Sequence, residues 1–149
     1  MPADQMRVLA KSATSKALAE RFTGDVWVDV ITGGAGDGTA TLATVHFSPG
    51  ARTAWHMHEQ GQTLHVTEGV GIVQSREGQT IIMRAGGTVE TPPGVWHWHG
   101  ALPDAFMSHL ALSVAGGDVE WGDHVADDKY RAAAAARRQD DDEQGGGSL

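Results

Sequence analysis

Short apolar runs separated by turn residues fill the chain from Asp25 to about Val114. Runs rich in Val, Ile, Thr and Trp, with Gly or Pro between them, are typical of β-strands. The pattern predicts eight or nine strands, including residues 27–31, 39–47, 63–74, 79–84, 88–91, 96–99 and 105–114. Short strands at near-regular spacing predict an all-β protein, a jelly-roll barrel closed from two sheets.

The two ends of the chain follow other patterns. Residues 1–21 are polar and rich in Ala, and we expect an N-terminal extension before a barrel domain at residues 22–131. Acidic residues from Asp127 precede five alanines and two arginines, which predicts a short C-terminal helix. Residues 132–149 should hold the end of this helix and a tail, disordered from residue 139 onward. The segment around Trp121 is expected to pack outside the barrel.

The composition narrows the classes of function. A chain of 149 residues can form one domain with its own core. The absence of Cys excludes disulfides and thiolate metal sites, and the net charge of −8 argues against a nucleic-acid partner. No stretch approaches the length of a membrane span, and the first residues show no apolar signal core. We therefore expect a cytoplasmic protein that does not enter a membrane.

The candidate chemistry lies in a group of histidines. Alternate side chains of a β-strand point to the same face, so His56 and His58 project from one side. Gln62 follows four residues later, and His97 follows a Pro-Gly turn in a second strand-like run. Three neutral imidazoles and an amide oxygen can close around one divalent cation. The alternative is a set of surface or core histidines that bind no metal.

Gln62 has a consequence for the charge of such a site. An amide oxygen is neutral, so three histidines and Gln62 would leave a divalent cation with its full charge, which favours an anionic ligand. A site with two open positions lacks the tetrahedral closure that zinc favours, so Mn or Fe is expected before Zn. The alternative is that Gln62 is a neutral spacer outside the ligand shell.

Two further histidines are candidates for catalysis. His99 lies two residues after His97 on the same face, where it is a further ligand, an outer-shell residue or part of the cavity wall. His109 lies in an apolar strand, where burial would keep it neutral and suited to act as a general base; a structural core histidine is the alternative. The placement of three histidines suggests no chemistry: His46, His65 and His124. Three tryptophans beside the candidates are expected to pack in the core or at an interface, with a substrate cage as the alternative: Trp55, Trp96 and Trp98.

The spacing of these residues resembles the two metal motifs of the cupin superfamily. His56, His58 and Gly69 fit the first motif, in which Gln62 stands where Glu is usual. The second motif is fitted by Pro92, Gly94 and His97, whereas Ala101 replaces its usual Asn. The resemblance implies the cupin double-stranded β-helix.

Longer stretches are similar to small bacterial cupins that include manganese-dependent hydroxynitrile lyases. They are residues 49–56, 61–64, 97–101, 109–111, 119–125 and 128–131. The resemblance implies the metal ligands His56, His58, Gln62 and His97. It makes His109 the base near the substrate hydroxyl, and His99 is the second catalytic candidate. The implied pocket residues are Ala43, Val45 and Ser113, the last standing where a Gln is familiar. The implied metal is Mn, with Fe, Co, Ni and Zn as alternatives.

The reaction that this resemblance implies is the reversible splitting of a cyanohydrin into an aldehyde or ketone plus cyanide. The same groups would serve aldol-like or nitroaldol addition. Two rival readings are a metal-dependent dioxygenase and a cupin that binds a metal or small ligand without turnover. Apolar residues on the outer parity of the strands predict a homodimer or homotetramer.

Overall fold

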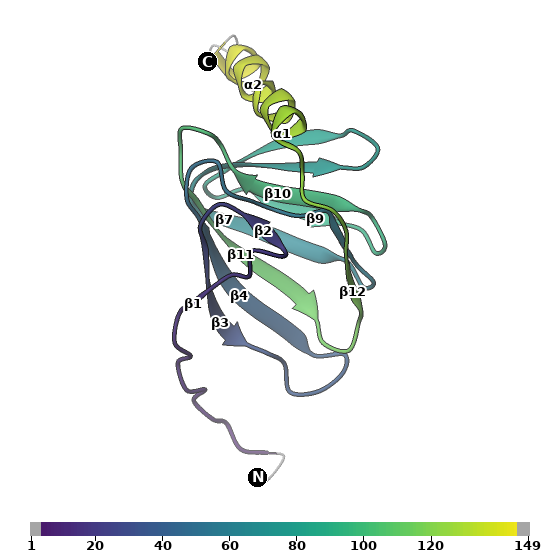
Figure 1. The fold of residues 1–149 in the computed structure, drawn as a ribbon. Helices are drawn as coiled ribbons and strands as arrows, with labels where there is room; N and C mark the ends of the chain where they lie inside the picture. The colour runs from purple at the N-terminus through teal and green to yellow at the C-terminus, as the bar shows by residue number, and fades with distance from the viewer. Residues whose placement is uncertain (1–3, 146–149) are drawn as a thin grey trace.

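The structure is a computed structural model that describes residues 4–145, and the side chains of residues 4–141. Within these residues it contains twelve strands and two helices (Figure 1). The long strands are β3 (Val26–Thr32), β4 (Ala40–Phe47), β7 (Gln62–Ser75), β8 (Thr80–Arg84), β9 (Thr88–Thr91), β10 (His97–Ala101) and β11 (Met107–Val114). The short strands are β1 (Ser15–Lys16), β2 (Phe22–Thr23), β5 (Arg52–Thr53), β6 (His56–His58) and β12 (Val119–Trp121). The helices are α1 (Asp127–Ala134) and α2 (Ala136–Gly145).

The strands form one strongly curled sheet. Its hydrogen-bonded order is β1-β3-β4-β11-β7-β10-β5-β2, with β8 and β9 on β7, and β6 between β10 and β12. The long strand β7 joins the two halves, because its first part pairs with β11 and β9 and its second part with β10 and β8. The predicted all-β fold is therefore confirmed. The hydrogen-bonded path of the described strands ends at β2 and does not return to β1, so the sheet curls into a half-barrel.

Glycines allow β7 to cross between the two halves. Gly69 has a φ of 80°, and a Cβ atom there would lie 1.9 Å from the carbonyl oxygen of Phe106. Only a residue without a side chain fits this close approach of two backbones. The register between β7 and β11 shifts directly afterwards, between Ser108 and His109. The glycine of the first cupin motif is thus required by the sheet rather than by the chemistry.

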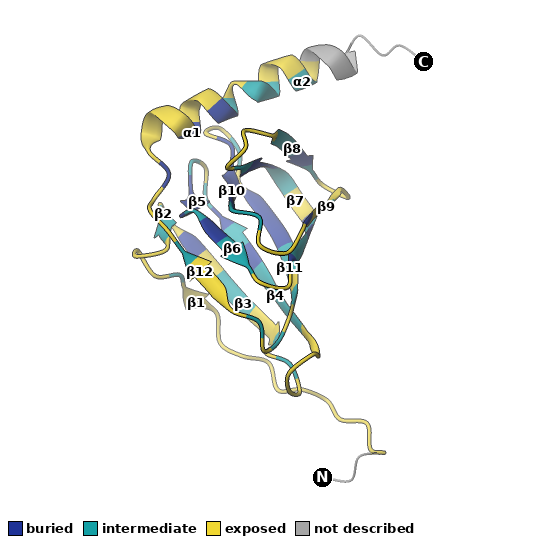
Figure 2. Cartoon of the chain, turned by 90° about the vertical axis from the view of Figure 1, so that its right-hand side faces the viewer, coloured by how far each residue is buried: buried dark blue, intermediate teal, exposed yellow. Residues whose placement is uncertain are grey.

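Two apolar clusters hold the fold together. One fills the curl of the sheet and includes the buried side chains of Phe47, Leu64 and Met107. The other is built around Trp98 and Tyr130 and joins the sheet to α1. Figure 2 shows the buried residues concentrated on the strands inside the curl, whereas the helices are mostly exposed.

The C-terminal segment is anchored by one buried arginine. The Arg52 Nη2 donates to the carbonyl oxygen of Val125 at 2.8 Å and to Asp127 at 2.7 Å. Its guanidinium lies 4.4 Å from the ring centroid of Tyr130, whose hydroxyl donates to the carbonyl oxygen of Ala101. These contacts fix the start of α1 against the sheet.

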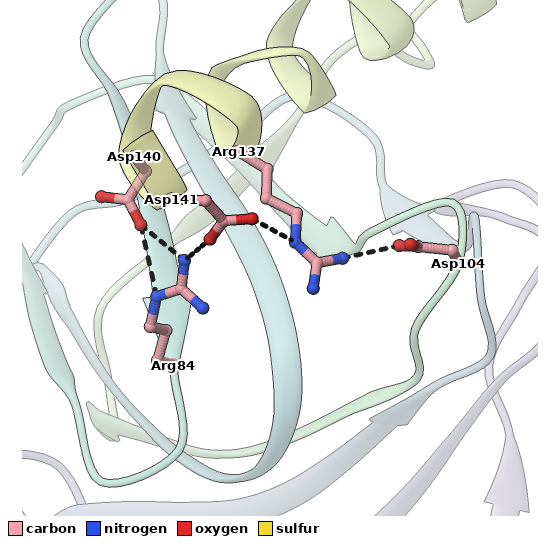
Figure 3. A network of polar contacts seen from close by, with 5 residues as sticks. All are labelled: Arg84, Asp104, Arg137, Asp140 and Asp141. Atoms are coloured by element: carbon pink, nitrogen blue, oxygen red, sulfur yellow. Dashed lines mark hydrogen bonds and ion pairs between the residues drawn. The ribbon is translucent and has the colours of Figure 1, made fainter. Parts of the chain in front are cut away.

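The helical region is longer than the sequence predicted. The prediction of disorder from residue 139 onward is wrong for residues 139–145, which belong to α2; residues 146–149 lie outside the described part. Arg84 on β8 pairs with Asp140 and Asp141, and Arg137 links Asp141 to Asp104 (Figure 3). These pairs offset the repulsion in the acidic run that suggested disorder.

In the described part of the chain, no helix has both the length and the apolar character that a membrane span requires.

Candidate metal centre

The four predicted ligands lie on three strands that meet inside the curl. His56 and His58 belong to β6, Gln62 is the first residue of β7, and His97 is the first residue of β10. His56 and His97 are direct partners in the β6–β10 ladder, with ring centroids 4.4 Å apart. The His58 ring lies 5.3 Å from that of His56 and 6.0 Å from that of His97. The fold therefore brings the two motifs together.

Backbone carbonyls fix the tautomers of the two central histidines. His56 Nδ1 donates to the carbonyl oxygen of Ala54, and His97 Nδ1 donates to that of Val95, both at 2.9 Å. Each neutral ring then carries a lone pair on Nε2. The Nε2 of His97 faces the Oε1 of Gln62 at 3.5 Å, so two acceptors confront each other. A cation bound between such atoms would satisfy both, and the residues present fit a metal.

The pKa values of these histidines also favour metal binding. Burial, together with charge repulsion from His97, lowers the pKa of His56 to about 3 and that of His58 to about 4. The pKa of His97 itself is lowered by burial. The rings are therefore neutral near pH 7, which is the form that binds a metal.

His99 joins this cluster from the side of the core. The ligand atoms of His56, His97 and His99 lie within 4.8 Å of one another, and such a three-histidine group in a curled sheet suggests a divalent metal ion. The Nε2 atoms of His58 and His99 are both buried and without a hydrogen-bond partner. The third imidazole that lies at ligating distance of His56 and His97 is that of His99, whereas the resemblance implies His58.

His109 lies behind His99. Its Nε2 is 3.0 Å from the Nδ1 of His99, and its side chain is fully buried against Phe47. Burial lowers the pKa of His109 to about 4, and burial together with His109 lowers the pKa of His99 well below its usual value. Both rings are therefore neutral near pH 7. Of these two residues it is His99 whose ring contacts that of His56, at a centroid distance of 5.1 Å, which the sequence alone did not indicate.

Two hollows open beside the cluster. The larger, of about 520 Å³, is lined by Gln62 and Ser113, and the smaller, of about 350 Å³, by His58 and Ser113. The other two predicted pocket residues lie deeper on the same strand face. Ala43 pairs with Ala111 and Val45 with His109 in the β4–β11 ladder. Neither His99 nor His109 lines these hollows.

The sequence analysis missed one aromatic residue of the site. Trp121, expected outside the barrel, stacks on the ring of His56 at a centroid distance of 4.7 Å and an interplanar angle of 24°. Spacing gave no signal for this contact, because Trp121 lies on β12, far along the chain from β6. The packing role predicted for two other tryptophans is confirmed: Trp98 is in the core and Trp55 packs against it, whereas Trp96 lies against Arg76.

Comparison with known proteins agrees with this geometry. A family model described as a cupin domain matches residues 43–111. A curated relative, the (R)-mandelonitrile lyase of Granulicella tundricola, is 40% identical over 129 residues, which are 85% of this chain and 98% of the relative. The chain belongs to the cupin family.

Solved structures place this cupin among small relatives. A cupin-like protein from Thermotoga maritima is 39% identical, with a TM-score of 0.77 over 86% of this cupin and 97% of that chain. A cupin-2 domain from Rhodospirillum rubrum shares the fold at 20% identity, with a TM-score of 0.65 over 91% of this cupin and 93% of its own chain.

Proposed function

We propose that this cupin is a metal-dependent lyase that reversibly cleaves cyanohydrins to an aldehyde or ketone and cyanide. The observation that carries the proposal is the 40% identity to an (R)-mandelonitrile lyase across nearly the whole of that protein. The buried histidine cluster supports it, because this chemistry needs a site that stabilises negative charge beside a neutral base. The same groups would serve aldol-like or nitroaldol addition.

His56, His58, Gln62 and His97 are proposed to hold a divalent transition metal, Mn before Fe, Co, Ni or Zn. When bound, the metal would supply Lewis acidity that stabilises an alkoxide or cyanide. Three imidazoles and an amide bring no negative charge of their own, so these ligands would not offset the charge of the cation as a carboxylate would. The pKa values of His56, His58 and His97 are shifted by burial, by neighbouring histidines, by backbone carbonyls and by Gln62, and not by a carboxylate.

His99 and His109 are proposed to handle the proton. The Nε2 of His99 takes the hydroxyl proton of the substrate, and the 3.0 Å contact between His99 Nδ1 and His109 Nε2 shares the resulting charge. The bond between the carbinol and nitrile carbons breaks, its electron pair leaves with cyanide, and the oxygen forms the carbonyl group. The proton then returns to cyanide. Ser113, with Ala43 and Val45 deeper along the strands, would shape the space for the organic group.

The test is cleavage of mandelonitrile, followed by the absorbance of benzaldehyde. We expect turnover by protein loaded with Mn²⁺ and its loss after the metal is removed with a chelator. Fully loaded protein that cleaves neither mandelonitrile nor an aliphatic cyanohydrin above the rate of free Mn²⁺ would refute the lyase.

We also propose that this cupin acts in the cytoplasm as a homodimer or homotetramer. Trp27 on β3 and Leu112 and Val114 on β11 are large exposed apolar residues on the two strands that flank β4, and such surfaces are typical of interfaces. Light scattering at micromolar concentration should give at least twice the mass of the chain. A monomer would contradict the proposal.

A further inference from the structure

Trp121 is held firmly against a proposed metal ligand. Its strand β12 pairs with β6, and the register sets Trp121 directly opposite His56. Phe22 packs against the indole with centroids 6.0 Å apart, and the Arg21 guanidinium lies 5.1 Å from its centroid. The next residue, Gly122, donates its backbone N–H to Trp55 at 2.7 Å. The indole therefore stays on His56 as β12 leads into α1.

The stack constrains the one freedom that His56 retains. Its hydrogen bond to Ala54 sets the tautomer, but the terminal torsion of a histidine is broad, so one hydrogen bond controls the ring plane weakly. An aromatic face 4.7 Å away and 24° from parallel restricts that plane. It leaves the lone pair of Nε2 free, because that lone pair lies in the plane of the ring.

The stack also responds to the charge on the ring. An imidazole that donates its lone pair to a dication becomes electron-poor, and the face of an indole is the most electron-rich of the aromatic side chains. Contact with Trp121 should therefore stabilise the metal-bound form of His56 more than the free form.

We infer that Trp121 is a positioning residue of the metal centre, which raises the affinity for a divalent metal through its stack on His56. The inference rests on the proposed metal site and is independent of the lyase reaction. It makes the C-terminal segment, with β12, part of the centre rather than an external support.

The experiment compares two substitutions with a matched control. Trp121→Leu removes the aromatic face but keeps apolar volume, and Trp121→Phe keeps a weaker face. The control is Trp96→Leu, because Trp96 precedes the ligand His97 but contacts Arg76. The dissociation constant for Mn²⁺ is measured by calorimetry, and the melting temperature is measured without metal.

We expect Trp121→Leu to weaken Mn²⁺ binding about 10-fold, the lower end of the range for residues that orient metal ligands. Trp121→Phe should fall between this variant and the wild type, and Trp96→Leu should bind as the wild type does. If Trp121→Leu does not fold, an affinity of Trp121→Phe below that of the wild type supports the inference.

An unchanged affinity in a folded Trp121→Leu variant, or in Trp121→Phe if the Leu variant does not fold, overturns the inference and leaves the lyase proposal intact. Equal weakening by Trp96→Leu also overturns it, since the effect would then be general packing. Wild-type protein that binds Mn²⁺ without cleaving cyanohydrins refutes the lyase but not the role of Trp121.

Discussion

Histidines on the outer face and on the inner face of the curled sheet of this cupin have different chemical roles. On β4 and β11, His46 and Ser108 point outward, whereas Val45 and His109 point into the curl. His46 uses both ring nitrogens, one at 2.8 Å from the Ser108 hydroxyl and the other at 2.9 Å from the Asp29 carboxylate. No ring nitrogen of His46 remains for a metal.

The histidines inside the curl differ from His46 in their hydrogen-bond partners. His58 and His99 each have a buried Nε2 without a hydrogen-bond partner. The pKa values of the inner histidines are shifted by burial and by neighbouring groups, none of which is a carboxylate. These inner histidines are His56, His58, His97, His99 and His109. A buried polar atom without a partner costs about 1–3 kcal/mol, so its persistence points to a ligand. The number of histidines in the chain is therefore a poor guide, and the face of the strand decides which of them can bind.

The sharpest test of this comparison exchanges one histidine from each group for alanine. His56→Ala should abolish binding of a divalent metal, because His56 is central to the cluster and stacks on Trp121. His46→Ala should keep full occupancy. Elemental analysis of the purified variants measures both, and full occupancy in His56→Ala would show that the ligands are assigned wrongly.

The next largest effect is expected at His109. His109→Ala should retain the metal but lose about 10²- to 10⁴-fold in cyanohydrin cleavage, the usual contribution of general-base catalysis, because His99 would lose the partner that shares its charge. His65→Ala is the matched control, since His65 faces outward and bonds to Thr88. A His109→Ala variant with wild-type turnover would reduce His109 to a core residue.

The acid sensitivity of the metal-free protein extends the comparison to stability. The inner histidines have pKa values below the ordinary 6.5, at about 3 for His56 and about 4 for His58 and His109. The unfolded chain therefore binds more protons than the folded one at acid pH. The contribution of these neutral histidines to the free energy of unfolding is fully present above pH 6.5 and is lost as the pH falls toward 4. The loss is up to about 1.4 kcal/mol per pH unit for each histidine.

Urea denaturation of the metal-free protein at pH 7, 6 and 5 measures this slope. His99→Leu should flatten it, because burial holds the pKa of His99 well below its usual value. A free energy of unfolding that does not change between pH 7 and pH 5 would contradict the prediction.

The sequence predicted the strands and the inner face better than the ends. Alternation along β6 and β10 places His56 with His58 and His97 with His99 without any knowledge of the fold. Which of His99 and His109 contacts His56 depends on how β10 and β11 pack across the curl. The alternation of residues along one strand gives no information about that packing. The sequence does not predict the positions of Trp121 and α2 for the same reason. Trp121 contacts His56 and α2 contacts Arg84, and both contacts join segments that are distant in the chain.

A smaller effect is expected from restoring a charge at Gln62. Gln62→Glu should keep or strengthen metal binding, because a carboxylate is the stronger ligand, but it should weaken binding of cyanide or azide by offsetting part of the metal charge. We expect about a 10-fold loss, measured by titration of the Co²⁺-loaded protein in visible light. An unchanged affinity would place Gln62 outside the ligand shell.

The smallest effect is expected at the ion pairs of α2, which depend on exposed groups. The Arg84 side chain is 33% exposed and that of Asp141 50%, so Arg84→Ala should lower the free energy of unfolding by at most about 1 kcal/mol. The loss should shrink in roughly 1 M salt, where charges on the surface are screened. Urea denaturation at low and high salt measures it, and Arg84→Lys should recover part of the loss. A loss of several kcal/mol that persists in salt would mean that the ion pairs of α2 stabilise the sheet as much as the core does. Exposed polar contacts would then contribute as much as the buried face, and the contrast between the two faces would no longer hold.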